Sequence, residues 1–275
     1  MTVTARGVTV QKQNRTILNQ VDLHATAGQV TGLIGPNGAG KSTLLSALAG
    51  DIQLAHGVVE VAGKDASEST ASELARTRAV MLQDVSVAFS FLVRDVVEMG
   101  RHPWGRGPDD AAIVDAALDA TGITHLQDRE IATLSGGERA RAAFARVLTQ
   151  QTQVVLLDEP TAAMDVHFQE QTMGAVRALA RRGVTVIVVL HDLQLAARYC
   201  DRVVCLKAGE ITAAGTVDEV YNDAILSSVY DWPITVLRSS GRILVAPDEA
   251  GEPVSGLWCP APAPPHPLKK LGIPC

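Results

Sequence analysis

The segment GPNGAGKST, residues 35–43, places glycines, a lysine and a serine at the spacing G-x-x-x-x-G-K-[ST] and fits this pattern at every position. Glycines let backbone N–H groups curl around an anion, and the lysine adds a point charge. The segment therefore predicts a loop that cradles the β- and γ-phosphates of a nucleotide, with the Ser42 hydroxyl on Mg²⁺. Its members are Gly35, Pro36, Asn37, Gly38, Ala39, Gly40, Lys41, Ser42 and Thr43.

Two acids and a histidine lie where neighbouring strands are expected to end. Asp158 and Glu159 close the apolar run VVLLDE, and His191 follows the run VTVIVVL. Asp158 could reach Mg²⁺ through water, and Glu159 could orient or deprotonate the attacking water. The carboxyl ends of parallel strands meet at one sheet edge, so His191 is predicted to contact the γ-phosphate.

A second glycine-rich helix start, in LSGGERARAAFARVL, begins at Ser135, Gly136 and Gly137. Free N–H groups, a hydroxyl and the positive end of a helix make a second anion site. The first loop already cradles the phosphates of the chain's own nucleotide. We therefore predict that the second site serves another molecule's nucleotide, in a head-to-tail pair of two copies related by a two-fold axis.

Alternating strands and helices must position these groups. Residues 29–34 form a short apolar run before the loop, and a helical pattern follows Lys41 up to Gly50. The alternation returns with strands at 154–158, 184–190 and 202–206 and helices at 168–181 and 193–199. Near-continuous apolar strands joined by helices predict an α/β fold with a mostly parallel sheet that is buried on both faces.

Charge, hydrophobicity and cysteine content exclude several classes of protein. The chain has 275 residues, a formal charge of -6 and a pI near 5.6, which argues against general affinity for nucleic acid or anionic lipid. The sequence shows no leader-like start and no run of eighteen apolar residues, so we expect that it does not cross a membrane unaided. The four cysteines lack paired metal spacing and are expected to be reduced thiols.

The motifs GPNGAGKST, LSGGER, VVLLDEP and VVLHD, in this order, resemble the Walker A, signature, Walker B and switch-histidine motifs of the ATP-binding cassette (ABC) ATPases. The resemblance covers about residues 2–237. It implies a P-loop NTPase cassette over residues 1–250, with an antiparallel β portion near the N-terminus and a helical subdomain inserted at about 84–134. The Pro-rich residues 251–275 would form a C-terminal tail.

The resemblance also implies roles for single residues, with ATP and Mg²⁺ as cofactors. Gln83 in MLQD would be the Q-loop glutamine, which senses Mg²⁺ and links to a membrane partner. Asp165 in TAAMD would be the D-loop aspartate at the dimer interface, and Ser135 and Gly137 would contact the γ-phosphate of the opposite subunit. The implied catalytic residues are Glu159, His191, Gln83 and Lys41. The implied metal site consists of Ser42, Gln83 and Asp158.

The sequence departs from the family pattern at two places. Glu138 stands where the signature usually has Gln, as in some importer branches. The first strands also lack the aromatic ring that often stacks on adenine. Lys12 or Arg15 falls near that place, so a cationic or aliphatic contact is expected to replace stacking.

Within the family, the segments after Gln83 and after residue 212 resemble importer ATPases for haem, iron siderophores and cobalamin. We favour haem, with a siderophore or cobalamin as alternatives; a soluble ATP-driven clamp or an adenylate-kinase-like enzyme fits less well. The implied partners are integral membrane permease subunits at the cytoplasmic face of the membrane and, indirectly, an extracytoplasmic binding protein. Phe89, Phe91 and Arg94 could line the groove for a permease helix, or the aromatic rings could belong to the core.

The tail contains a Cys-Pro pair at Cys259, with His266 nearby. Such pairs sometimes ligate haem through the thiolate. An inert thiol in an extended tail is the favoured interpretation.

Overall fold

A six-stranded sheet lies at the centre of the computed structural model, which describes residues 2–13, 15–82 and 91–249. All neighbours in this sheet are parallel except the last strand, which pairs antiparallel at one edge. The strand order is β10-β9-β3-β8-β7-β6. Their bounds are β3 (Val30–Ile34), β6 (Arg78–Met81), β7 (Val154–Asp158), β8 (Thr185–Val189), β9 (Arg202–Lys207) and β10 (Glu210–Thr216).

The central strands β3, β7 and β8 are buried at every residue, as their continuous apolar sequences predict. Successive side chains point to opposite faces, so Leu156 and Leu157 of β7 belong to two different hydrophobic clusters. Helices or a second sheet must therefore cover both faces of this sheet.

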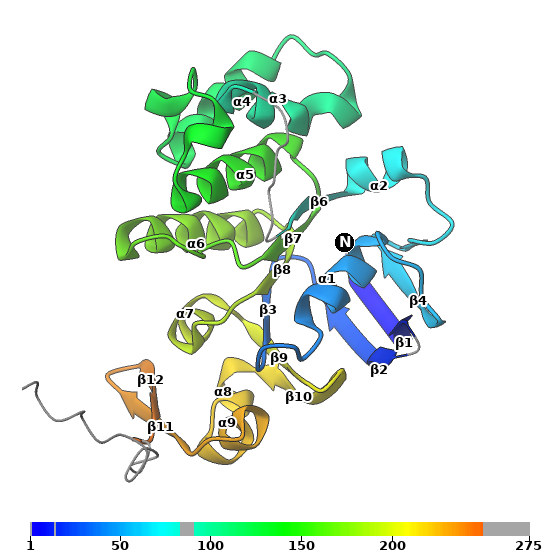
Figure 1. The fold of residues 1–275 in the computed structure, drawn as a ribbon, viewed down its shortest axis with the longest axis vertical. Coiled ribbons are helices and arrows are strands. Elements are labelled where there is room, and N and C mark those ends of the chain that lie inside the picture. The colour runs from blue at the N-terminus through cyan, green and yellow to red at the C-terminus, as the bar shows by residue number, and fades with distance from the viewer. Residues whose placement is uncertain (1, 14, 83–90, 250–275) are drawn as a thin grey trace, which may run out of the picture.

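One face is covered by α1 (Lys41–Ala49) together with a four-stranded antiparallel sheet. Leu44, Leu45 and Leu48 of α1 are fully buried between the two sheets. Figure 1 shows this blue and cyan layer beside the central strands. The second sheet has the order β2-β1-β4-β5, with β1 (Val3–Lys12), β2 (Arg15–Ala25), β4 (His56–Val61) and β5 (Lys64–Asp65).

Four helices cover the other face, and Phe144, Met173 and Leu226 from three of them are buried against it. These helices are α5 (Gly136–Gln150), α6 (Val166–Arg181), α7 (Leu193–Tyr199) and α9 (Asp223–Tyr230). Figure 1 shows α5 and α6 side by side along the sheet, away from α1.

Helices also occupy the described part of the chain between β6 and β7, where the family resemblance implied a helical subdomain. They enclose a separate hydrophobic cluster that includes Val97, Leu118 and Ile131 and that reaches α5 through Ala142 and Ala145. The elements are α3 (Val93–Glu98), η1 (Met99–Trp104), α4 (Asp110–Ala120), η2 (Thr124–Leu126) and η3 (Ile131–Thr133). A short helix, α2 (Ala71–Thr77), precedes β6. The division into a main domain and a helical subdomain stays a prediction.

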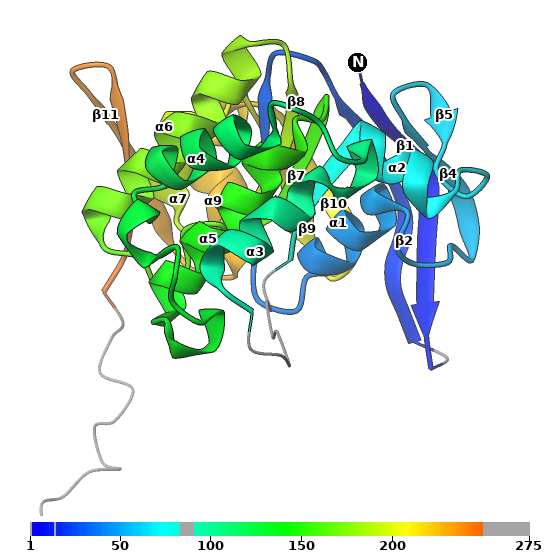
Figure 2. The same cartoon turned by 90° about the horizontal axis from the view of Figure 1, so that it is seen from above.

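The chain after the main sheet forms α8 (Val217–Val220), α9 and a hairpin of β11 (Ile234–Ser239) and β12 (Arg242–Pro247). Figure 2 shows this hairpin at the end of the molecule opposite β4 and β5. None of the helices in the described ranges is long and apolar enough to span a bilayer.

The predicted fold class is confirmed: a mostly parallel sheet, an antiparallel β portion near the N-terminus and helices between them. The expected helix at 193–199 matches α7, and the other expected bounds differ by at most a few residues. The Pro-rich tail with Cys259 and His266 lies outside the described residues, as do Gln83 and Phe89.

Candidate nucleotide site

The phosphate loop runs from the end of β3 to the first turn of α1, as its motif predicted. Gly35 has a φ of 145°, and a Cβ there would lie 2.0 Å from the Leu206 carbonyl oxygen, so only glycine fits. Gly40 caps α1 without any side-chain hydrogen bond. The first N–H groups of α1 are therefore left for an anion, which the positive end of the helix also favours.

Lys41 is packed inside its own loop, with only 6% of its surface exposed. Its Nζ donates to the carbonyl oxygens of Gly35 at 2.8 Å and Pro36 at 3.0 Å. Burial lowers the pKa of Lys41, while Glu159 and Asp158 act in the opposite direction. The ammonium group is thus held close to the place where phosphate oxygens would arrive.

Asp158 and Ser42 meet the chemical requirements of a Mg²⁺ site. Asp158 is 3% exposed, and its Oδ1 has no hydrogen-bond partner within the part of the chain that the structure describes. Burial raises the pKa of this carboxyl group, and a hydrogen bond from Ser42 partly offsets the rise. A carboxylate and a hydroxyl are hard oxygen ligands, which Mg²⁺ prefers together with substrate phosphates. The third predicted ligand, Gln83, lies outside the described residues.

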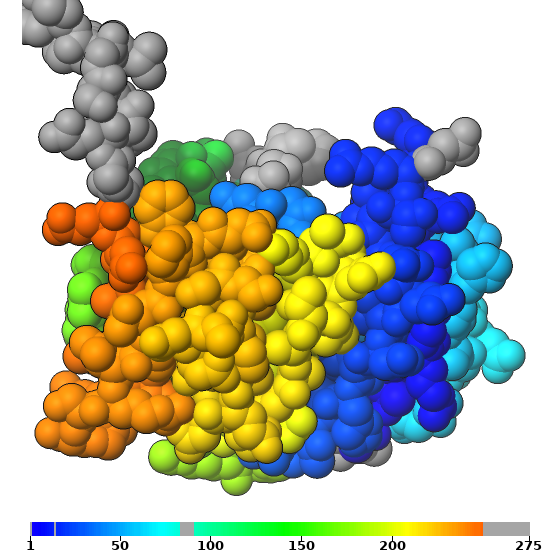
Figure 3. Space-filling model, turned by 90° about the horizontal axis from the view of Figure 1, so that it is seen from below, coloured from blue at the N-terminus to red at the C-terminus, as the bar shows by residue number. Residues whose placement is uncertain are grey.

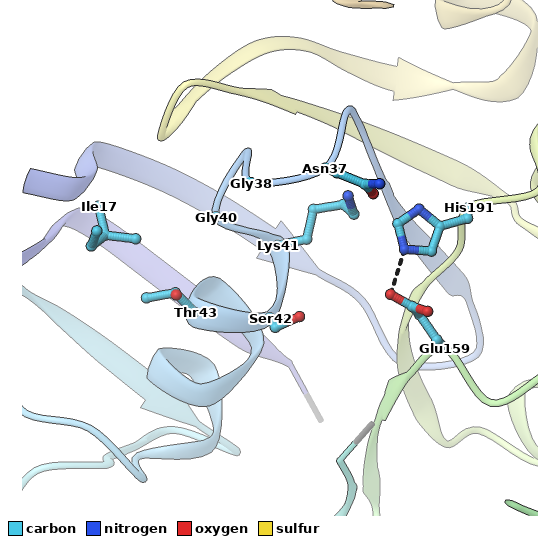
Figure 4. Close-up of a pocket in the computed structure, with 9 residues that line it drawn as sticks. All are labelled: Ile17, Asn37, Gly38, Gly40, Lys41, Ser42, Thr43, Glu159 and His191. Carbon is cyan, nitrogen blue, oxygen red and sulfur yellow. Dashed lines mark hydrogen bonds and ion pairs between the residues drawn. The ribbon is translucent and has the colours of Figure 1, made fainter. Parts of the chain in front are cut away.

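Glu159 and His191 come together from neighbouring strands, with a hydrogen bond between Glu159 Oε1 and His191 Nε2 (Figure 4). Glu159 follows β7 and His191 lies two residues after β8. The Glu159 backbone is in the left-handed region at a φ of 50°, and its N–H donates to the Val189 carbonyl oxygen at 3.2 Å. The carboxylate is thus fixed at the sheet edge in a position from which it could take a proton from water.

Residues 37–43 of the loop share one cavity of about 650 Å³ with Glu159 and His191, while Asp158 is not among its described lining residues. The cavity also includes Ile17, at the side of the loop away from His191 (Figure 4). The described lining residues are Ile17, Asn37, Gly38, Gly40, Lys41, Ser42, Thr43, Glu159 and His191.

The cavity beside the loop is lined by Ile17 rather than by Lys12 or Arg15. Lys12 and Arg15 pair with each other at the exposed tip of the β1–β2 hairpin, and neither is among the described residues that line the cavity. The aliphatic residue that lines the cavity is Ile17, two residues after Arg15 and on the same face of β2. The alternation of this strand was the signal that could have identified it.

The second glycine-rich motif caps α5 and does not line this cavity within the described chain. Ser135 Oγ accepts the Glu138 N–H at 3.3 Å, and Glu138 Oε2 accepts the Ser135 N–H at 2.7 Å. The Ser135 hydroxyl also hydrogen-bonds to the Glu138 carboxylate, and the two bonds from Ser135 lower the pKa of Glu138. Glu138, noted in the sequence as a departure from the family, therefore has a structural role at the start of the helix.

The signature motif is packed directly against the predicted D-loop. A Cβ on Gly137 would lie 2.7 Å from the Ala163 carbonyl oxygen, so any larger residue would push the two segments apart. Asp165 caps α6 by accepting the Phe168 N–H at 3.0 Å. The two predicted dimer-interface elements thus lie on one surface of the chain.

Arg141 is a functional candidate that the sequence did not single out. Its guanidinium lies 3.6 Å from the centroid of the Phe168 ring on α6 and donates to the Gly122 carbonyl oxygen at 3.1 Å. It is 6% exposed, so it links α5, α6 and the end of α4 in the interior. An arginine on the buried, Ala-rich face of a predicted helix was the available signal.

The proposed permease groove is only partly described. Phe91 packs against the hydrophobic cluster of α3 and α4, which favours the core alternative for this ring. The Arg94 guanidinium bonds to Asp115 at 2.7 Å and to Gln127 at 2.8 Å. Its role at a groove stays a prediction.

We expect Asp158→Asn to raise the thermal midpoint of the nucleotide-free protein, because the buried ionised carboxylate is lost. The native pKa of Asp158 is raised, so its unfavourable contribution grows as the pH rises from the ordinary Asp pKa through the native one. The parent should therefore lose stability as the pH rises through this range. The variant should lack the part of this loss that comes from ionisation of Asp158. Mg²⁺-dependent ATP affinity should fall about 10- to 100-fold. Thermal melts against pH and nucleotide titrations with and without Mg²⁺ check both effects.

Asp51→Asn is the matched control, since Asp51 is a surface carboxylate paired with Arg78 and lies outside the cavity. If Asp158→Asn bound ATP with the parental dependence on Mg²⁺, Asp158 would have no part in the metal site.

Comparison with known proteins agrees with this geometry. Residues 18–162 match the ABC transporter family. The chain is 48% identical over 248 residues to the hemin import ATP-binding protein HmuV of Streptomyces coelicolor, covering 88% of this chain and 89% of that protein. It is 42% identical to the cobalamin import ATP-binding protein BtuD of Halobacterium salinarum, covering 90% and 64%.

Among solved structures, a metal-chelate type ABC transporter in an inward-facing conformation superposes with a TM-score of 0.76 at 24% identity, over 90% of this chain and 97% of that chain. At this identity the superposition supports the fold alone. The family match, the identity to HmuV and the phosphate loop, Glu159 and His191 around one cavity lead to one conclusion: the chain belongs to the ABC transporter family, as an ATP-binding ATPase of that family.

Proposed function

We propose that this protein is the ATP-hydrolysing subunit of a membrane importer for haem. The observation that carries the proposal is the division of the phosphate-binding groups: the loop, Glu159 and His191 share one cavity, while Ser135 to Gly137 lie on another surface. Such a chain is complete only when a second copy supplies its signature motif. The cargo is inferred from the names of the hemin import relatives, of which the first three are 45–48% identical.

In this proposal, ATP binding begins when the Lys41 ammonium group exchanges its hydrogen-bond acceptors. Its Nζ leaves the carbonyl oxygens of Gly35 and Pro36 and binds phosphate oxygens, while the first N–H groups of α1 bind the same phosphates. Ile17 lies against the base or sugar end. Mg²⁺, held by Ser42 and Asp158 with Gln83 as the third predicted ligand, would neutralise charge on the phosphates.

Hydrolysis is assigned to Glu159, which accepts a proton from the attacking water, while His191 fixes its carboxylate and faces the γ-phosphate. Ser135 and Gly137 of a second copy would close the site from the other side. Closure of the two copies around ATP would move the permease subunits, and hydrolysis would reopen them, so that transport follows a ligand-driven population shift. The chain would then lie at the cytoplasmic face of the membrane, bound through the permease.

The test is to co-express this chain with the membrane protein encoded beside it, purify the pair in detergent and reconstitute it in liposomes. We expect ATP-dependent uptake of haem and none of a ferric siderophore or of cobalamin. The control is the same complex carrying Lys41→Ala, which should bind the permease but transport nothing. Uptake of cobalamin or of a siderophore would change the assigned cargo. If no membrane protein co-purified with the chain, a soluble clamp would be favoured.

A further inference from the structure

The first residue of the phosphate loop is held by a side chain from far along the sequence. The Gly35 N–H donates to the Tyr230 hydroxyl oxygen at 3.0 Å. Tyr230 is the last residue of α9, and its ring packs against the cluster beneath α6 and α7. Burial raises the pKa of Tyr230, so its hydroxyl stays neutral at physiological pH. A C-terminal helix therefore reaches the base of the nucleotide site.

Two further contacts fix the surroundings of this hydrogen bond. Lys207, at the end of β9, donates to the Ser228 carbonyl oxygen and to Asp231 Oδ1, both at 2.6 Å. Leu206 lies so close to Gly35 that a Cβ on the glycine would meet its carbonyl oxygen. The end of β9, the end of α9 and the start of the loop thus hold one another in place. Figure 3 shows the yellow and orange segments forming a continuous surface next to the blue N-terminal strands.

Both polar backbone groups of Gly35 are engaged, but by different kinds of partner. Lys41 holds the carbonyl oxygen and is the group that must move to a phosphate when nucleotide binds. Tyr230 holds the N–H and is not among the described residues that line the cavity, so nucleotide need not displace it. The hydrogen bond from Gly35 to Tyr230 can therefore persist when Lys41 turns to a phosphate.

We propose that Tyr230 is a positioning residue for nucleotide binding, which keeps the phosphate loop in its binding conformation while Lys41 exchanges partners. This inference rests on the proposed nucleotide site. It gives the C-terminal helix α9 a part in ATP binding rather than in the covering of the sheet alone. The contribution belongs to binding, because Tyr230 holds the phosphate loop and is not among the described residues that line the cavity with Glu159 and His191.

The experiment compares Tyr230→Phe with Tyr199→Phe. Each substitution removes one hydroxyl and keeps the ring, but the Tyr199 hydroxyl donates to Glu170 on the surface of α6. For Tyr230→Phe we expect KM for ATP and the dissociation constant of a fluorescent ATP analogue to rise about 3- to 10-fold, the loss of one hydrogen bond. We expect kcat to stay within about 2-fold, since the catalytic groups are unchanged. Tyr199→Phe should leave both constants at parental values.

Hydrogen exchange of the peptide covering residues 35–41 gives an independent readout in the nucleotide-free protein. Exchange should be faster in Tyr230→Phe and parental in Tyr199→Phe. The inference would be overturned if Tyr230→Phe kept the parental KM for ATP and the parental hydrogen exchange. It would also be overturned if both variants lost the same ATP affinity, in proportion to the fall in their thermal midpoints. Lys41→Ala separates the two proposals: if it bound the analogue as the parent does, the nucleotide site itself would be wrong.

Discussion

Replacing Glu159 by Gln is expected to lower ATP turnover about 10²- to 10⁴-fold, the usual contribution of a general base. The amide keeps the size of the side chain and can still bond to His191, so the cavity should keep its shape. ATP affinity should stay within a few-fold of the parent or increase, because a negative charge beside the γ-phosphate is removed. ATP that binds without being cleaved should hold two chains together. Steady-state hydrolysis, nucleotide titration and gel filtration with ATP measure the three effects.

Glu170→Gln is the matched control, because Glu170 also accepts hydrogen bonds from neighbouring side chains, Arg198 and Tyr199, but lies outside the cavity. Its turnover should be parental. Near-normal turnover in Glu159→Gln would assign the proton transfer to another group. A loss of ATP binding equal to the loss of turnover would instead mean that Glu159 supports the site rather than the reaction.

The sequence predicted the fold and the approach of the phosphate loop to Glu159 and His191 because both depend on local patterns. Short, β-branched apolar runs such as VVLLD and VTVIVVL favour strands that are buried on both faces, and the structure has them as such. A parallel sheet then brings the carboxyl ends of β3, β7 and β8 to one edge whatever the loops do. Glu159 and His191 were therefore predictable neighbours without knowledge of any helix packing.

The contacts that hold the residues of the site in place were not predictable, because each contact joins segments that are far apart in the sequence. Tyr230 lies 195 positions from Gly35, and no pattern around either residue indicates the other. The position of Ile17 depends on where the β1–β2 hairpin turns, with several register shifts along the pair. Local signals determine which side chains can do chemistry, and long-range packing determines which residues hold them in place.

The same packing favours the proposed second copy. Ser135 begins α5, while Glu159 and His191 end strands of the central sheet, and Ser135 lies outside the lining of the described cavity. Gly137 is packed against Ala163, and Arg141 connects α5 to α6, so the motif cannot swing towards its own phosphate loop without breaking these contacts. If the signature motif binds phosphate at all, the phosphate must belong to another chain.

Mixing two inactive variants should therefore restore ATP hydrolysis. Lys41→Ala disables the loop, and Ser135→Asp places a negative charge where the opposite γ-phosphate would bind, each costing about 10²- to 10³-fold in turnover. Asp is as good a helix cap as Ser, so α5 should keep its start. In a mixed dimer, the intact loop of one chain faces the intact signature of the other. An equal mixture should recover up to about a quarter of parental turnover, because half of the dimers carry one complete site of two.

The control is a chain that carries both substitutions, mixed with Lys41→Ala. Every dimer in that mixture lacks an intact loop, so its turnover should stay at the level of the single variants, although the total protein and the Ser135→Asp content are comparable. Recovery in the first mixture and not in the second requires Lys41 and Ser135 to act on one nucleotide from different chains. Failure of recovery, with mixed dimers verified by two affinity tags, would mean that each chain completes its own site.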